Sequence, residues 1–168
     1  WLMRLCQGVI CVSKQMKLDL QKKIHGYSHF YICNNMLSFD KEKLPKEFIP
    51  LSHPIRLIYI GRLSPEKGIL DFIEVFNRLK NKDQFTLTIL GDGLQRNLVV
   101  EKLQTYQLKN VNYLGNVKDP SLYLKEADLL VMPSHTEGLP MTLIESLASS
   151  VPVLSNEVGA IAELVTTH

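Results

Sequence analysis

Short apolar runs alternate with amphipathic stretches along most of the chain, a pattern that predicts strands alternating with helices. We expect strands over residues 8–13, 30–35, 56–60, 86–90, 111–114, 129–132 and 151–154. We expect helices over residues 14–25, 69–80, 94–106, 120–126, from the Pro140 region to about 149, and 160–165. Within residues 69–80, a three-residue repeat predicts the buried face: Leu70, Ile73, Phe76 and Leu79. This alternation is typical of an α/β, Rossmann-like fold, with a parallel sheet covered by helices on both faces.

A change in composition divides the chain. Residues 38–54 carry three prolines and several lysines, which is typical of a linker. We therefore expect one unit at 1–37, a linker at 38–52 and a larger unit at 53–168. The first unit is too small to hold a core alone.

Composition sets only broad limits on function. The chain has 168 residues, of which 45% are hydrophobic and 21% charged, as in an ordinary globular core. A net charge of +2 favours neither nucleic acid nor a membrane as a partner. No apolar run reaches the ~18 residues that span a bilayer, and no secretory signal is visible. Because the chain opens on Trp1, we expect a fragment or a processed form.

The cysteines favour structural thiols. Cys6, Cys11 and Cys33 are odd in number and have no CxxC spacing. We expect three buried thiols in a reducing cytosol and no metal site.

Two glutamates, Glu137 and Glu145, lie on either side of a Gly-Pro break. Pro140 is well placed to open a helix, since its missing N–H is no loss there. Glu137 would then precede the helix and Glu145 would lie roughly two turns inside it. The unpaired amides of the first turn, Met141 to Leu143, attract an anion, phosphate above all, and Gly138 lets the backbone approach a ligand. Amides for a phosphate and carboxylates for sugar hydroxyls suit a nucleotide sugar.

The stretch from Glu137 to Glu145 resembles the Glu-x7-Glu motif of retaining glycosyltransferases of family 4, which have the GT-B fold. Further motifs of that family follow in family order across roughly residues 8–165. They are Gly61-Arg62-Leu63-Ser64-Pro65-Glu66-Lys67-Gly68, Leu90-Gly91-Asp92-Gly93, Tyr113-Leu114-Gly115-Asn116-Val117, Ala127-Asp128-Leu129-Leu130-Val131-Met132-Pro133-Ser134, Pro152-Val153-Leu154 and Gly159-Ala160-Ile161-Ala162-Glu163-Leu164-Val165. By this resemblance, residues 53–168 are the C-terminal, donor-binding domain of a group 1 glycosyl transferase, incomplete at its C-terminus. Residues 1–37 are the tail of the N-terminal, acceptor-binding domain, and 38–52 link the two.

The resemblance also implies roles for particular residues. Arg62 and Lys67 would neutralise the diphosphate and stabilise the leaving group as the glycosidic bond breaks. Glu145 would accept hydrogen bonds from the ribose hydroxyls, and Glu137 would contact the donor sugar. The predicted catalytic residues are Glu137, Arg62 and Lys67. The predicted donor-binding residues are Gly61, Arg62, Lys67, Asn116, Val117, Glu137, Gly138, Leu139, Pro140, Met141, Thr142, Leu143 and Glu145, with Asn116 and Val117 holding the base largely through backbone groups.

Each of these roles has a structural alternative. The two cations also suit a solvated surface pair, the two glutamates suit charges near a helix start, and Asn116 suits an ordinary turn. We interpret His135 as a solvated or packing residue. Gly91-Asp92-Gly93 lacks the third glycine of a dinucleotide fingerprint, so it indicates turn geometry and disfavours an NAD-dependent enzyme.

The chain departs from the family pattern at two places, where it affects local turn geometry. Gly159-Ala160 replaces a common Gly-Gly pair. Ser149-Ser150 stands where a glycine usually precedes the Pro-Val pair.

The sequence thus predicts a retaining, hexosyltransferase-type enzyme that transfers a sugar from a nucleotide diphosphate sugar, UDP-linked by default, to a glycan or lipid-linked acceptor. We expect no cofactor, no metal and no nucleic-acid partner. The expected setting is bacterial surface polysaccharide or lipopolysaccharide synthesis in the cytoplasm, with room for peripheral contact at the inner face of the membrane. The fragment alone should bind donor weakly and transfer no sugar. The alternative is a non-catalytic nucleotide-sugar-binding or regulatory protein that keeps the donor pocket.

Overall fold

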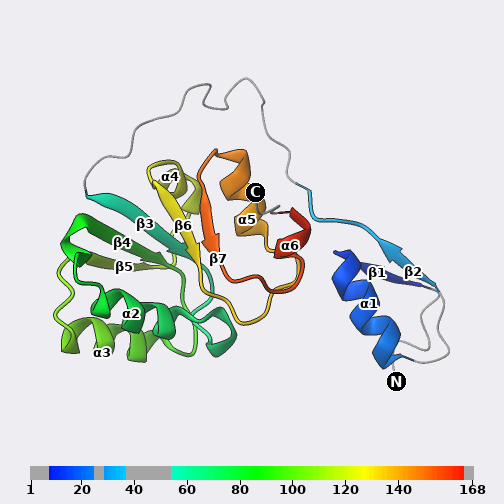
Figure 1. Cartoon of the computed structure of the whole chain (residues 1–168), viewed down its shortest axis with the longest axis horizontal. Coiled ribbons are helices and arrows are strands. Elements are labelled where there is room, and N and C mark those ends of the chain that lie inside the picture. The colour runs from blue at the N-terminus through cyan, green and yellow to red at the C-terminus, as the bar shows by residue number, and fades with distance from the viewer. Residues whose placement is uncertain (1–7, 25–28, 37–53, 165–168) are drawn as a thin grey trace.

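The computed structural model describes residues 8–24, 29–36 and 54–164 (Figure 1). Its larger sheet has five parallel strands in the order β5-β4-β3-β6-β7. They are β3 (Ile55–Ile60), β4 (Phe85–Leu90), β5 (Val111–Gly115), β6 (Leu129–Met132) and β7 (Val153–Ser155). The predicted strands are confirmed, with small shifts at their ends. β7 begins two residues later than expected, after Pro152, which has no N–H to donate to the ladder.

Helices cover both faces of this sheet, as the sequence predicts. α2 (Ile69–Arg78) and α3 (Arg96–Thr105) pack on one face through a core that includes Phe76, Leu87 and Val99. α4 (Pro120–Lys125), α5 (Met141–Ala148) and α6 (Ile161–Leu164) pack on the other face, around Ile58, Leu130 and Leu143. Figure 1 shows the two helix layers on opposite sides of the strands. Two short 3-10 turns, η3 (Pro65–Lys67) and η4 (Lys82–Gln84), complete the connections.

The predicted buried stripe of α2 was partly wrong. Ile69, Ile73 and Phe76 are fully buried, at spacings of four and three residues that follow the 3.6-residue helical repeat. Leu79 lies beyond the helix end in extended backbone and is exposed. A strict three-residue repeat drifts off the buried face of a helix, which accounts for the error.

The first unit forms a separate two-stranded parallel sheet. β1 (Val9–Cys11) pairs with β2 (Phe30–Ile32), and α1 (Lys14–Lys23) connects them. The Ser13 hydroxyl caps α1 by accepting a hydrogen bond from the Met16 amide at 3.0 Å. β2 is shorter than predicted and ends before Asn34 and Asn35. The predicted linker, residues 38–52, lies outside the described residues.

The prediction of three buried thiols was also wrong. Cys11 is buried in β1, but Cys33 is exposed just after β2 ends. Cys33 lies in the irregular segment that the sequence had assigned to the strand, and it has left the packed face. Cys6 lies outside the described residues.

The order of the strands creates a switch point at one edge of the sheet. From β3 the chain winds outward through β4 to β5, and then returns to place β6 on the other side of β3. The loops that follow β3 and β6 therefore leave the sheet toward opposite faces and open a crevice between them. In doubly wound sheets ligands bind in this crevice, beyond the carboxyl ends of the strands.

The loop after β7 braces the loop after β6. Asn156 Nδ2 donates to the Ser134 carbonyl at 3.0 Å, and the Ala160 amide donates to the Gly138 carbonyl at 3.1 Å. Gly159 has a φ of 59°, and a Cβ added there would lie 1.8 Å from the Glu137 carbonyl oxygen. Of the Gly-Gly pair common in the family, this chain keeps the glycine at position 159, where the close backbone approach requires it. The second position is Ala160, which is fully buried.

The Ser149-Ser150 pair, which stands where the family usually has a glycine, includes a residue in a strained backbone conformation. Ser150 follows the C-cap of α5 with a φ of 57°, in the left-handed region that glycine adopts more easily.

Gly159→Ala should lower stability by ~1–3 kcal/mol, because an alanine there combines a left-handed φ with a backbone clash. The measurement is the urea or thermal unfolding midpoint. Gly138→Ala is the matched control, since its added Cβ would meet only Val12 Cγ2 at 3.7 Å. Equal losses in the two variants would contradict the bracing role of Gly159.

Asp128→Asn should remove a pH-dependent part of the stability. The Arg56 guanidinium donates to Asp128 at 2.8 and 3.1 Å, and this hydrogen bonding lowers the pKa of the carboxyl group. A lowered pKa contributes stability above the unfolded value of ~3.9, and the contribution is lost as pH falls through the folded value. Urea midpoints of wild type and variant should therefore differ at pH 7 and converge as pH falls through the folded pKa of Asp128. A gap independent of pH would rule this out.

Candidate functional site

Two adjacent pockets lie at the carboxyl edge of the sheet. The first, which we term the switch-point pocket, has a volume of about 220 Å³ and lies between the loops after β3 and β6. It is lined by Tyr59, Ile60, Gly61, Arg62, Lys67, Val131, Met132, Ser134, Glu137, Pro140, Met141 and Thr142. The topology thus leads to a pocket at the place where ligands bind in such sheets.

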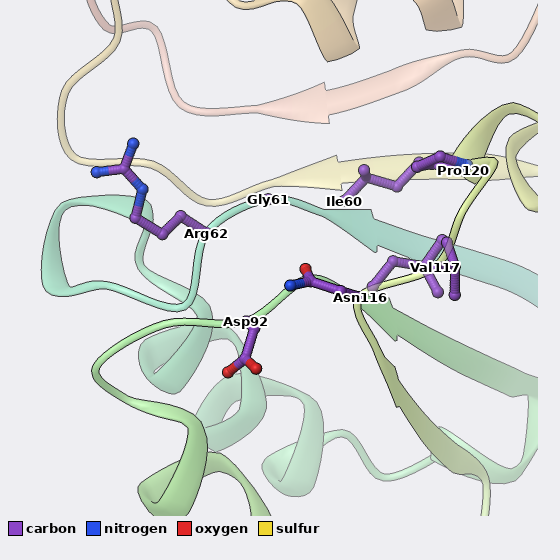
Figure 2. Close-up of a pocket in the computed structure, with 9 residues that line it drawn as sticks. Ile60, Gly61, Arg62, Asp92, Asn116, Val117 and Pro120 are labelled. Carbon is purple, nitrogen blue, oxygen red and sulfur yellow. The ribbon is translucent and has the colours of Figure 1, made fainter.

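The second, which we term the outer pocket, has a volume of about 360 Å³ and lies over β3, β4 and the loop after β5. Figure 2 shows Asn116 between Gly61 and Asp92, Val117 on the side of Pro120, and the Arg62 guanidinium turned away from both Asn116 and Val117. Ile60, Gly61 and Arg62 line both pockets. An elongated ligand could therefore pass from one pocket to the other across Arg62.

The centre of the switch-point pocket is a buried carboxylate. The Glu137 side chain is 6% exposed. Lys67 Nζ lies 2.7 and 2.8 Å from its two oxygens, and the Ser134 hydroxyl donates to Oε1 at 2.7 Å. A buried charge is costly unless it is paired and hydrogen-bonded, and these two donors meet that requirement. The structure thus brings together Glu137 and Lys67, which are 70 residues apart in sequence.

Arg62 lies at the junction of the pockets, on an exposed turn. Among the described residues it forms no ion pair, so its guanidinium is open to an anion. The Tyr59 hydroxyl donates to the Arg62 carbonyl at 2.9 Å. Burial, with the nearby Glu137 and Glu66 carboxylates, raises the pKa of Tyr59, so the phenol stays protonated and keeps this bond at neutral pH.

The start of α5 adds further anion-binding potential. Pro140 occupies the N-cap rather than the first turn, and it provides no side-chain cap for the amides that follow. Met141 and Thr142 line the switch-point pocket at this helix start. The partial positive charge of a helix N-terminus therefore lies within the same pocket as Lys67.

Other predicted donor residues lie near the pockets without lining either of them. Leu143 packs in the core, Gly138 is exposed, and the Leu139 carbonyl accepts a hydrogen bond from Asn35 Nδ2 at 2.6 Å. Glu145 is half-buried and is the fifth residue of α5, little more than one turn in. The expected two turns were wrong, because two turns span about seven residues and Glu145 lies only four residues after Met141, the first residue of the helix. The ribose role of Glu145 stays a prediction.

Several lining residues were missed by the sequence reasoning. Ser134 and Asp92 fall inside quoted motifs, and their positions directly after apolar strands could have indicated the site. Nothing in the sequence singles out Tyr59, which faces the core within β3. His135 lines neither pocket and is exposed beside Asp71, with the His135 Nε2 to Asp71 Oδ2 distance at 2.7 Å.

The described residues contain neither a metal-ligand cluster nor a membrane-spanning helix. No group of three or more His, Cys, Asp and Glu side chains could hold a metal ion within residues 8–24, 29–36 and 54–164. In that same part of the chain, no helix has the length and apolar character needed to cross a membrane.

Two relatives and one solved structure illustrate what the chain is similar to. It is 28% identical to glycogen synthase of Mycobacterium tuberculosis, over 98% of this chain and 41% of the relative. It is 35% identical to the putative teichuronic acid biosynthesis glycosyltransferase TuaC of Bacillus subtilis, over 76% of this chain and 31% of the relative. A mutant of S. aureus TarM, in complex with fondaparinux, alpha-GlcNAc-glycerol and UDP, superposes with a TM-score of 0.85 at 23% identity. That match covers 98% of this chain and 33% of TarM, and it shows the shared GT-B fold.

The chain thus spans less than half the length of these relatives. The family model described as "Glycosyl transferases group 1" matches residues 40–168, which is most of the chain. With these motifs, this fold and this match, the chain belongs to the group 1 glycosyl transferases.

Proposed function

We propose that this chain is the donor-binding part of a retaining, hexosyltransferase-type glycosyltransferase. Its donor would be a nucleotide diphosphate sugar, UDP-linked, and its acceptor a glycan or a lipid-linked glycan. The observation that carries the proposal is the arrangement of charges in the joined pockets. Arg62 lines both pockets, Lys67 and the start of α5 line the switch-point pocket, and the buried Glu137 carboxylate is paired with Lys67 there.

This arrangement matches the chemical order of a nucleotide diphosphate sugar. The outer pocket would hold the nucleoside, with the base against Asn116 and Val117. Arg62, Lys67 and the first-turn amides of α5 would hold the diphosphate, which carries the negative charge. The sugar would then reach Glu137 in the switch-point pocket, where a carboxylate can accept its hydroxyl hydrogens.

The same groups suggest how the leaving group is stabilised. Negative charge develops on the diphosphate as the glycosidic bond breaks, and fixed cations and amides stabilise it without rearrangement. We propose a front-face retaining route in which the leaving phosphate accepts the proton of the acceptor. Because Arg62, Lys67 and the helix amides supply the positive charge, the proposal includes neither a metal nor another cofactor.

The biological setting is part of the proposal. The TarM complex contains UDP, and the name of TuaC places that relative in teichuronic acid biosynthesis. We propose a role in bacterial surface polysaccharide or lipopolysaccharide synthesis, in the cytoplasm and in reach of the inner face of the membrane. The glycosyltransferase relatives support transfer of a sugar over binding without turnover.

Arg62→Ala and Lys67→Ala should each weaken UDP binding by ~1.5–3 kcal/mol, the typical value of a charge-assisted contact. Uridine affinity should hardly change, since uridine has no phosphate. Calorimetric titration of each variant with UDP and uridine measures both effects. Arg78→Ala, which removes an exposed cation at the end of α2, is the control for net charge. Equal losses for UDP and uridine would contradict the diphosphate assignment.

Glu137→Gln and Glu145→Gln should distinguish the contact with the donor sugar from the contact with the ribose. Glu137→Gln should spare UDP and weaken UDP-glucose, whereas Glu145→Gln should weaken UDP and UDP-glucose alike. The reason is that Glu137 lines the switch-point pocket beyond the cations, while Glu145 is assigned to the ribose. Calorimetry with both ligands measures the difference. The division of roles fails if folded Glu137→Gln protein no longer binds UDP.

A further inference from the structure

Ser134 lines the switch-point pocket in the loop that follows β6, after Pro133, and the sequence gives it no role of its own. We propose that Ser134 is a positioning residue that fixes the Glu137 carboxylate for the donor sugar. This inference rests on the proposed function and deepens it. The observation behind it is the 2.7 Å hydrogen bond from the buried Ser134 hydroxyl to Glu137 Oε1.

The hydrogen bond makes the two carboxylate oxygens unequal. Among the residues that the structure describes, Oε1 accepts from both Ser134 and Lys67, whereas Oε2 accepts from Lys67 alone. A carboxylate offers about four lone-pair sites in total, two on each oxygen. Oε1 is therefore saturated, and Oε2 keeps capacity for one more donor. The serine thus selects which oxygen faces a ligand.

The hydrogen bond from Ser134 to Glu137 also matters because Lys67 is proposed to bind the diphosphate as well as Glu137. An ammonium has three N–H donors, and in this structure Lys67 Nζ lies within hydrogen-bonding distance of both Glu137 oxygens. When a diphosphate competes for Lys67, the lysine holds the carboxylate less firmly. Ser134 has no such competing ligand, so it is the group that keeps Glu137 in place in the loaded site.

The backbone around Ser134 is itself held on both sides. Its carbonyl accepts a hydrogen bond from Asn156 Nδ2 at 3.0 Å. The amide of the next residue, His135, donates to the Glu66 carbonyl at 2.9 Å, which ties the loop to η3. The serine is 3% exposed. A fixed backbone and a buried hydroxyl leave little freedom to lose on binding, which is the condition for effective positioning.

The test compares Ser134→Ala with Ser146→Ala. Ser146 is also a buried serine, and its hydroxyl donates to the Val151 carbonyl at 2.8 Å, away from both pockets. Each variant is titrated with UDP, UDP-glucose and UDP-N-acetylglucosamine, and its thermal midpoint is recorded. Ser134→Ala should weaken the preferred UDP-sugar roughly tenfold while leaving UDP within about twofold. Ser146→Ala should change stability without changing the ratio of the two affinities, and Ser134→Thr should restore that ratio.

A double-mutant cycle tests whether Ser134 acts through Glu137. If it does, Ser134→Ala should add nothing in a Glu137→Gln background, because the carboxylate that it positions is gone. A full additional loss there, or an equal loss for UDP and UDP-sugar, would overturn the inference.

Should Ser134→Ala not fold, a structure of the wild-type complex with the UDP-sugar decides. A Ser134 Oγ to Glu137 distance beyond hydrogen-bonding range in that complex overturns the inference, and a retained bond supports it. Wild-type protein that binds none of the three nucleotides would instead overturn the proposed function.

Discussion

The ion pair between the buried Glu137 carboxylate and the half-buried Lys67 ammonium is the interaction on which the shape of the candidate site depends. The Glu137 side chain is 6% exposed, and its charge would destabilise the fold if it had no partner. The groups that donate hydrogen bonds to it are therefore needed for stability, and they also compete with a ligand for the carboxylate oxygens. The pair joins η3 to the loop after β6, across the crevice between two neighbouring strands. The same contact that holds the two loops together thus places a cation and an anion side by side in the pocket.

The parallel sheet explains why so much chemistry gathers at one edge. All five strands end at the same side, and the winding reverses at β3, so the loops after β3 and β6 diverge there. Close backbone approaches then lock the loops against one another. A Cβ at Gly91 would lie 2.0 Å from the Gly61 carbonyl oxygen, much as one at Gly159 would clash with Glu137. The glycines in these loops therefore allow the loops to pack closely and form the pocket walls, and do not serve to make the loops flexible.

Much of this architecture was predictable from local pattern. In a chain whose apolar runs alternate with amphipathic stretches, a short apolar run such as Leu129–Met132 predicts a buried parallel strand. Pairings across long sequence separations were not predictable from pattern alone. Nothing local shows that Lys67 pairs with Glu137, 70 residues away, or that the Asn156 side chain donates to the Ser134 carbonyl, 22 residues away. The exact start of α5 was not predictable either. Pro140 suits both the N-cap and the first turn, and only the packed helix decides between them.

The central claim is that one elongated nucleotide site runs across the carboxyl edge of the sheet. Its most direct test is amide chemical-shift mapping of the isotopically labelled chain during titration with UDP. The account predicts that the shifts concentrate in residues 60–62, 67, 91–92, 116–117 and 141–143, which line or adjoin the two pockets. It predicts little change along the outer surfaces of α2 and α3. Shifts confined to those helices, or no shifts at millimolar UDP, would contradict it.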